Sequence, residues 1–359
     1  MNKMFNIFIF SLLFLNGCAS YFNKKINQEK TEDLAKNFEI PKDTFEKFKV
    51  SEELKGIAAP ESVKQLNVAV FSEKKVPPLK EKLKSIAVKK ITKTPSVIVK
   101  DFSPLPVDYP ASLSQLDEQS KKVWSLFKNY SRPEENMIIE VFFLGIKVGN
   151  LAVTNVSNVR IGEVNAFHLK GRFITEKFYE TFYKIDDTLE SFVQVQDFLP
   201  LRYSLLQRES GQKVDDLQLF DYEKLKTFTW FKKVKDNDER KSNEEIYIPR
   251  YIQDSFSVIF FVRGLPLKKG DQYEIPVVNK AKIWITKISV LGEDEVRIND
   301  QWLKAIKLKA ENYELGKDEK KSSVEFWYSN DQHRMLLKFM AKVKIGSVEG
   351  KLNLFEPGK

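Results

Sequence analysis

Apolar and polar residues alternate from Glu135 to the C-terminal end, and this alternation limits the possible folds more than any other feature of the chain. Because successive side chains of a strand point to opposite faces, a period of two predicts strands with one face toward a core. Pairs such as Ser210-Gly211 and Asn330-Asp331 separate the runs, and we interpret the polar run 235–243 as another turn. The short connections favour antiparallel pairing, so we predict a mainly β domain with one large curved antiparallel sheet or half-barrel. The predicted strands cover residues 137–144, 147–156, 164–174, 181–195, 201–206, 214–222, 227–234, 273–278, 281–290, 302–310, 323–328, 335–343 and 347–355.

One segment of this region does not alternate. Asp254 can cap a helix over residues 255–263, and Gly264 stands where a left-handed residue commonly ends a helix. A helix without a polar face must be buried, and the concave face of a curved sheet is the available place. We therefore predict a buried plug helix with the apolar residues Phe256, Val258, Ile259, Phe260, Phe261 and Val262.

The beginning of the chain predicts a secretion signal. A short basic stretch precedes the apolar run 5–15, which is too short to span a ~30 Å hydrocarbon core as a helix. The next residues, Leu15-Asn16-Gly17-Cys18, resemble the bacterial lipobox, and Cys18 is the only cysteine. The resemblance implies that residues 1–17 are a lipoprotein signal peptide and that Cys18 carries a diacylglyceryl thioether and an N-acyl chain such as palmitate. An ordinary signal peptide with an incidental cysteine and an uncleaved anchor are the alternatives.

Ala19 and Ser20 follow Cys18, so the aspartate that retains enteric lipoproteins in the inner membrane is missing. We therefore expect a lipid-anchored protein on the periplasmic side of the outer membrane, with the inner membrane as the alternative. Several acyl chains make such an anchor stable, where a single chain would be marginal.

Residues 18–110 carry most of the positive charge. Residues 21–100 contain 18 Lys and 11 acidic residues, whereas 101–359 contain 40 basic and 39 acidic residues. This composition buries little apolar surface, so we expect a lipidated, basic and largely disordered tether. Its charge favours anionic surfaces such as lipid head groups or peptidoglycan, and nucleic acid is not expected behind a secretion signal. We interpret the apolar piece around Phe45, Phe48 and Val50 as transient local structure, with docking on a partner as the alternative.

An amphipathic helix is predicted over residues 111–131. Ser114 and Asp117 fit a capping arrangement, and the residues of one helical face are Leu116, Val123, Phe127 and Tyr130. The β domain then takes residues 132–359.

An ordered series of short motifs runs through the β region. The motifs are Gly145-Ile146-Lys147-Val148-Gly149, Tyr183-Lys184-Ile185-Asp186-Asp187 with Glu190-Ser191, Leu199-Pro200, Asp254-Ser255-Phe256-Ser257 and Phe326-Trp327-Tyr328-Ser329 with Arg334. In this order they resemble the DUF3108 family of bacterial envelope proteins, over about residues 136–355. The resemblance implies a secreted β-rich domain without an established activity. By architectural analogy it also implies the half-barrel with plug helices of lipoprotein-carrier folds.

Few residues indicate catalysis or metal binding. The histidines are His168 and His333, which we interpret as packed or surface residues, so we predict neither a metal site nor a cofactor. Carboxylates are more plentiful, and a pair of them in a cleft would suit a glycan hydrolase. The candidates are Asp186, Asp187 and Glu190, which we interpret instead as solvated turn residues.

The remaining signal comes from aromatic residues. Trp230 and Trp284 fall on predicted strands, and with Phe256, Phe260 and Arg263 they are our candidates for an apolar groove beside the plug helix. We expect Arg263 to contact the last carbonyls of the helix or a carboxylate, with a ligand anion as the alternative.

We therefore predict a non-enzymatic, lipid-anchored periplasmic binding protein. Its concave face would bind an apolar ligand, such as an acyl chain or lipid, or another envelope protein. One alternative is a structural scaffold that links the outer membrane to peptidoglycan or to an envelope complex, and a second is a glycan hydrolase.

Overall fold

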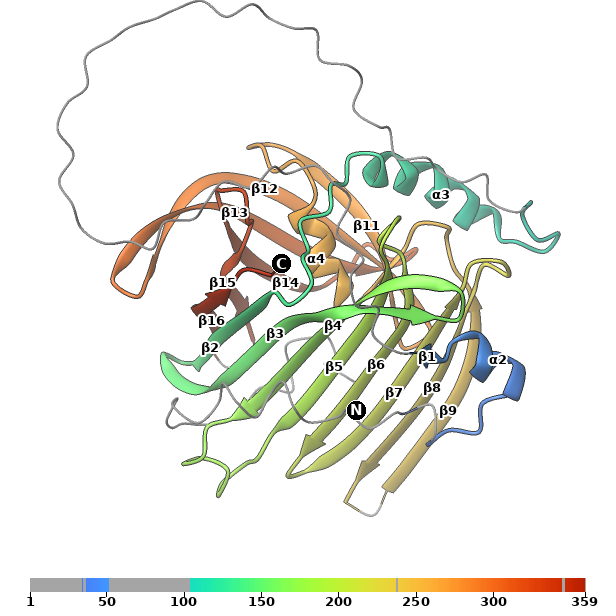
Figure 1. Cartoon of the computed structure of the whole chain (residues 1–359), viewed down its shortest axis with the longest axis horizontal. Helices are drawn as coiled ribbons and strands as arrows, with labels where there is room; N and C mark the ends of the chain where they lie inside the picture. Colours follow the sequence, from blue (N-terminus) through green and yellow to red (C-terminus); the bar gives the residue numbers. More distant parts are fainter. Residues whose placement is uncertain (1–33, 35–36, 52–103, 237, 344–345, 359) are drawn as a thin grey trace, which may run out of the picture. The chain divides into compact units, whose positions relative to one another are not determined.

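The computed structural model describes residue 34 and residues 37–51, 104–236, 238–343 and 346–358, which all belong to one of the two compact units of the chain. Its dominant feature is a sheet of 16 strands in the order β10 to β16 followed by β2 to β9, with β1 paired to β3 beside this path (Figure 1). Neighbouring strands are antiparallel, except that β10 and β11 are parallel. The strands are β1 (Val50–Ser51), β2 (Asn136–Phe143), β3 (Ile146–Ile161), β4 (Val164–Thr175), β5 (Asp186–Gln194), β6 (Pro200–Glu209), β7 (Gln212–Asp221), β8 (Lys226–Lys235), β9 (Asp238–Tyr247), β10 (Gln253–Asp254), β11 (Gln272–Asn279), β12 (Lys282–Ile298), β13 (Gln301–Glu314), β14 (Lys320–Ser329), β15 (Leu336–Lys342) and β16 (Ser347–Glu356).

The sheet curves around the short helix α4 (Ser257–Arg263). A Cβ atom at Gly171 of β4 would lie 3.0 Å from the ring of Phe256, just before the helix. On another side of the helix, the Tyr328 hydroxyl of β14 donates a hydrogen bond to the Ile259 carbonyl oxygen at 2.9 Å. Because β4 and β14 belong to one sheet, the sheet must bend around α4, and Figure 1 shows the helix lying on its inner face. The prediction of a curved antiparallel sheet with a buried plug helix is confirmed.

The ends of α4 differ from the prediction. The helix begins at Ser257 rather than Ser255, and Asp254 Oδ1 accepts hydrogen bonds from the backbone N–H groups of Phe256 and Ser257, both at 2.7 Å. Gly264 has φ −80°, so the predicted left-handed ending is wrong. The glycine is required for packing instead, because a Cβ atom there would lie 2.2 Å from the Phe127 ring.

The outer face of strands β3 to β8 is covered by an N-terminal segment, which we expected to be transient. Helix α2 (Lys42–Lys47) and strand β1 (Val50–Ser51) lie there, and β1 pairs with β3. Phe48 is buried in a cluster with Trp230, and Lys47 Nζ lies 3.0 Å from Asp221 Oδ2. The apolar side chains of this segment therefore pack on the β domain itself.

Helix α3 (Ala111–Trp124) is shorter than predicted, because the expected helix over 111–131 ends at Trp124. The predicted side-chain cap is also wrong: Pro110 occupies the N-cap position without a side-chain hydrogen bond. Asp117 instead accepts hydrogen bonds from the Tyr109 hydroxyl at 3.0 Å and from the Arg250 backbone N–H at 2.6 Å. Its carboxylate thus connects α3 to the segment after β9.

Several predicted strand boundaries are wrong: the strand predicted over 281–290 extends to Ile298, and the one over 147–156 extends to Ile161. The run 235–243, interpreted as a turn, contains the first six of the ten residues of β9, and the strand predicted from residue 181 begins at Asp186. Strand β9 escapes detection because the first eight of its ten residues are charged or polar in the sequence DERKSNEEIY, so no apolar alternation marks it. Among the described residues, no helix is both long and apolar enough to cross a membrane.

Candidate functional site

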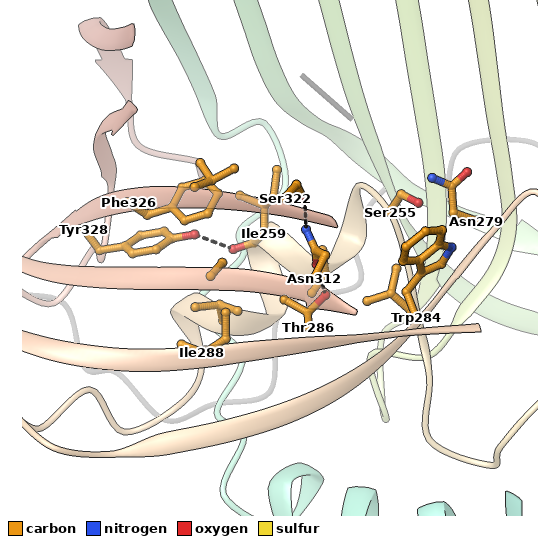
Figure 2. A pocket seen from close by; sticks show the side chains of 15 residues that line it. Ser255, Ile259, Asn279, Trp284, Thr286, Ile288, Asn312, Ser322, Phe326 and Tyr328 are labelled. Atoms are coloured by element: carbon orange, nitrogen blue, oxygen red, sulfur yellow. Dashed lines mark hydrogen bonds between the residues drawn. The ribbon is translucent and has the colours of Figure 1, made fainter. Parts of the chain in front are cut away.

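An apolar pocket of about 90 Å³ lies between one side of α4 and strands β11 to β14 (Figure 2). The helix contributes Val258, Ile259 and Val262 to its wall. These residues are one turn or less apart on a helix and therefore share a face, which points away from Phe256 and Phe260.

The opposite wall consists of rows of side chains that run across the strands. Ile288, Ala310 and Val324 are partners in the registers of β12, β13 and β14, and all three line the pocket. Ala310 stands at the centre of this row and fills little of the space between its larger neighbours. A small residue at this position is one reason why the helix and the sheet leave a cavity.

The next row in the same register is polar. It consists of Thr286, Asn312 and Ser322, which also line the pocket. Thr286 Oγ1 donates to Asn312 Oδ1 at 2.7 Å, and Asn312 Nδ2 donates to Ser322 Oγ at 2.9 Å. This direction leaves the hydroxyl proton of Ser322 and the second N–H of Asn312 without a protein acceptor among the described residues.

A further donor lies at the same end of the pocket. The indole N–H of Trp284 is buried and has no hydrogen-bond partner within the described ranges. Figure 2 shows Trp284 beside Ser255 and Asn279, whereas Phe326, Tyr328 and Ile288 lie toward the other end. The pocket is therefore apolar at one end and rich in hydrogen-bond donors at the other.

Two buried interactions fix the position of α4 beside the pocket. The first is the hydrogen bond from Tyr328 to the Ile259 carbonyl, and burial raises the pKa of the Tyr328 hydroxyl. The second is the ion pair of Arg263, whose two terminal nitrogens lie 2.6 and 3.1 Å from the carboxylate oxygens of Glu135. Arg263 thus contacts a carboxylate, as predicted, and its second nitrogen also donates to the His333 carbonyl at 2.7 Å.

Asp254 is a buried carboxyl group at the beginning of α4. Besides the two backbone N–H groups, the Ser191 hydroxyl donates to its second oxygen. Burial raises the pKa of Asp254 to about 6, although these hydrogen bonds act in the opposite direction. A proton can therefore be gained or lost at this position near neutral pH.

Of the five residues predicted for an apolar groove, only Trp284 lines the pocket. Phe260 and Arg263 belong to α4 and Phe256 immediately precedes it, but none of the three lines the pocket. Trp230 lies in the cluster on the outer face of the sheet. The sequence analysis missed the small and polar wall residues. Their alternation at Thr286 and Ile288, and at Ser322 and Val324, was visible, but it does not show which face lines a cavity.

The three carboxylates proposed for acid/base chemistry lie on strand β5 rather than on a turn. Asp186 forms two hydrogen bonds with Arg172 at 2.8 and 2.9 Å, whereas Glu190 contacts His168 Nε2 at 3.1 Å. Four residues of a strand span about 13 Å, and Asp187 points to the other face of the sheet. This arrangement does not bring two of them together in one cleft. In the described part of the chain, no group of three or more His, Cys, Asp or Glu side chains could hold a metal ion.

The lipobox with Cys18 and much of the predicted tether lie outside the described residues. Comparison with protein families matches residues 139–353 to the model described as protein of unknown function DUF3108. No curated protein matches the chain.

Two solved structures are similar in fold. One is a β-barrel-like protein of the domain of unknown function DUF1849 from Brucella abortus, with 10% identity and a TM-score of 0.42, covering 62% of this chain and 97% of that chain. The other is a putative exported protein with a YmcC-like fold from Bacteroides fragilis, with 5% identity and a TM-score of 0.30, covering 64% and 99%. At these values neither similarity indicates a function.

Proposed function

The chain belongs to the DUF3108 family of unknown function, and we propose that its β domain is a binding protein for a small amphiphile with a single acyl or alkyl chain. The observation that carries this proposal is the pocket between α4 and β11 to β14, because it is apolar at one end and polar at the other. With about 90 Å³ the pocket is smaller than most ligand sites, so it would hold the polar group and the adjoining part of the chain, and the rest of the chain would extend out of the pocket, which is partly open.

The polar end favours a ligand that accepts hydrogen bonds. Ser322, Asn312 and Trp284 each offer a proton that has no acceptor in the part of the protein that the structure describes. A buried donor that gains an acceptor is stabilised, whereas a second donor placed against it would leave both unpaired. A carboxylate, ester or phosphate oxygen therefore fits this end better than an ammonium group does.

The pocket can be tested with two substitutions at neighbouring positions of β14. Val324→Phe adds volume inside the pocket, whereas Ser323→Phe adds the same ring on the opposite face of the strand. We expect full-length protein to bind dodecanoate, measured by displacement of a fluorescent apolar probe, and Val324→Phe to weaken binding at least tenfold. Ser323→Phe should bind like the parent, which also controls for binding at the apolar N-terminal run. Equal binding by all three proteins would overturn the proposal.

The polarity of the head group gives a second test on the same protein. Dodecanoate and dodecylamine have the same chain, so the difference between their affinities isolates the head group. We expect dodecanoate to bind more tightly, and Ser322→Ala, which removes one of the donors available to the head group, to reduce this difference. A preference for the amine would contradict the assignment of a donor-rich end.

The location in the bacterial envelope is part of the proposal. It is supported by the N-terminal run 5–15 followed by Leu15-Asn16-Gly17-Cys18, and it places the pocket in the periplasm with a lipid anchor at Cys18. Labelled palmitate should be incorporated into the parent protein but not into Cys18→Ser. Incorporation that is independent of Cys18 would exclude this anchor.

A further inference from the structure

Four large apolar side chains are exposed on two neighbouring connections at one end of the sheet. Phe178 and Phe182 belong to the β4–β5 loop and are 66% and 70% exposed. Leu144 belongs to the β2–β3 turn, Ile146 is the first residue of β3, and both are also exposed. The two connections are adjacent because Thr175, at the end of β4, pairs with Gly149, near the start of β3. The described part of the chain has ten exposed large apolar side chains, and four of these ten lie at this end of the sheet.

The β4–β5 loop holds its phenylalanines outward by a well-anchored backbone. Hydrogen bonds from Phe182 N and Tyr183 N to the Tyr179 carbonyl oxygen form a helical turn, which places residues 178 and 182 on one side. Beneath them Tyr179 is buried, and the Tyr183 hydroxyl donates to Glu209 Oε2 at 2.8 Å. The hydrogen bonds of the loop therefore hold both phenylalanine rings at the surface.

The β2–β3 turn shows the same exposure at a strained position. Leu144 has φ +50°, a left-handed conformation that hairpin turns usually assign to Asn, Asp or Gly. The Leu144 side chain packs in part on Gly346 and is still 57% exposed, so this turn also presents a large apolar side chain at the surface.

We propose that this end of the sheet inserts into the interface of a lipid bilayer with anionic head groups. Apolar side chains on protruding tips, flanked by lysines, are typical of segments that lie in the head-group region. Lys177 and Lys184 flank the two phenylalanines and are exposed, whereas Glu180 between them is half-buried. Exposed apolar side chains on two narrow connections suit a membrane better than a protein partner. A stable protein–protein interface needs roughly 800 Å² of surface on each partner.

The test uses a fluorescent label in the loop of the full-length chain. Cys18→Ser removes the native thiol, and Thr181→Cys introduces one at an exposed position between the phenylalanines. The label is an environment-sensitive nitrobenzoxadiazole group. We expect its emission to shift to the blue with phosphatidylcholine vesicles that contain phosphatidylglycerol, and to shift much less with phosphatidylcholine alone.

A matched control separates loop insertion from attachment through the N-terminal segment. The same label at Glu163→Cys lies on the β3–β4 turn, at the other end of these strands, and should not shift. Phe182→Ser should lower the lipid affinity reported by the loop label about tenfold, and Lys177→Gln about fivefold. Because these side chains are exposed, neither substitution should unfold the domain.

Two results would overturn the proposal. In the first, the chain floats with the vesicles while the loop label remains unshifted. In the second, the label shifts with protein concentration in the absence of lipid, which would assign the exposed rings to contact between two copies of the chain. The test is independent of the pocket, because Thr181 does not line it.

Discussion

The two sides of α4 pack very differently although the helix is apolar on both. On one side, Phe261 is fully buried, and its ring lies 4.6 Å from the Phe127 ring and 4.2 Å from the Trp124 ring. On the other side, Val258, Ile259 and Val262 face the wall of β11 to β14 across the pocket. An apolar helix surface therefore guarantees burial but not close packing.

The difference follows from what each side meets. The filled side meets aromatic rings from α3 and the residues after it, which reach into the space around the helix. The hollow side meets hydrogen-bonded strands that cannot move individually toward the helix, and their central row contains Ala310. The Tyr328 and Arg263 interactions meanwhile hold the helix in place. The strands cannot move toward the helix and the helix cannot move toward the strands. A cavity therefore remains beside the small side chain of Ala310.

Truncating one side chain on each side of α4 tests whether the two sides differ in packing. Phe261→Ala removes a ring with aromatic contacts and should lower the free energy of unfolding by about 3–5 kcal/mol. Ile259→Ala only enlarges an existing cavity beside a half-buried side chain, so we expect a loss of about 2 kcal/mol or less. Urea denaturation of both variants measures the difference. Equal losses would mean that the two sides are packed alike.

The sequence predicted the helix and its burial but not the asymmetry around it. The absence of a polar face at residues 256–262 identifies a plug, because no other environment accepts such a helix. Which side is hollow depends on Ala310 and Ser322, more than 40 residues away in the chain, and on a strand register that no local pattern specifies.

Trp230 shows a second limit of the sequence analysis. It is followed by Phe231 along β8, so each face of this strand carries an aromatic ring: Trp230 packs in the cluster with Phe48 on the outer face, and the Phe231 ring contacts Lys280 on the inner face. Alternation assigns Trp230 and Phe231 to opposite faces, but it cannot show which face is the inner one. Strand β9 shows the opposite limit: its side chains are mostly exposed, and its ladder of hydrogen bonds to β8 has no apolar signature.

The buried carboxyl group of Asp254 accepts hydrogen bonds at the beginning of α4, so its titration affects the stability of the helix that separates the two sides. Burial raises its pKa from 3.8 to about 6, so between these values the folded protein binds the proton more strongly than the unfolded chain does. The free energy of unfolding should therefore fall as pH rises from about 4 to about 6, by about 2–3 kcal/mol for this group.

Asp254→Asn should remove this part of the pH dependence, since the amide oxygen can still accept the backbone hydrogen bonds of Phe256 and Ser257. The measurement is the urea midpoint as a function of pH for the parent and the variant. Asp216 is buried with a pKa of about 6 and contributes in the same direction, so Asp216→Asn is the matched control and should remove a separate part. Carboxylates with a lowered pKa, such as Asp294, act in the opposite direction in both proteins, so the test is the difference between the parent and Asp254→Asn. If this difference did not change between pH 4 and pH 6, the assigned protonation of Asp254 would be wrong.

The smallest expected effect on stability comes from filling the hollow side. Ala310→Leu adds a side chain to the pocket, where there is room for it, so the free energy of unfolding should change by less than about 1 kcal/mol. The same substitution at Ala305 of β13 provides the control, because Ala305 is fully buried away from the pocket and overpacking there should cost about 1–3 kcal/mol. A stable Ala310→Leu protein that no longer binds dodecanoate would show that the cavity is retained for a ligand rather than for the fold. Comparable destabilisation at both positions would mean that the helix and the sheet are already in full contact, and the contrast between the two sides of α4 would disappear.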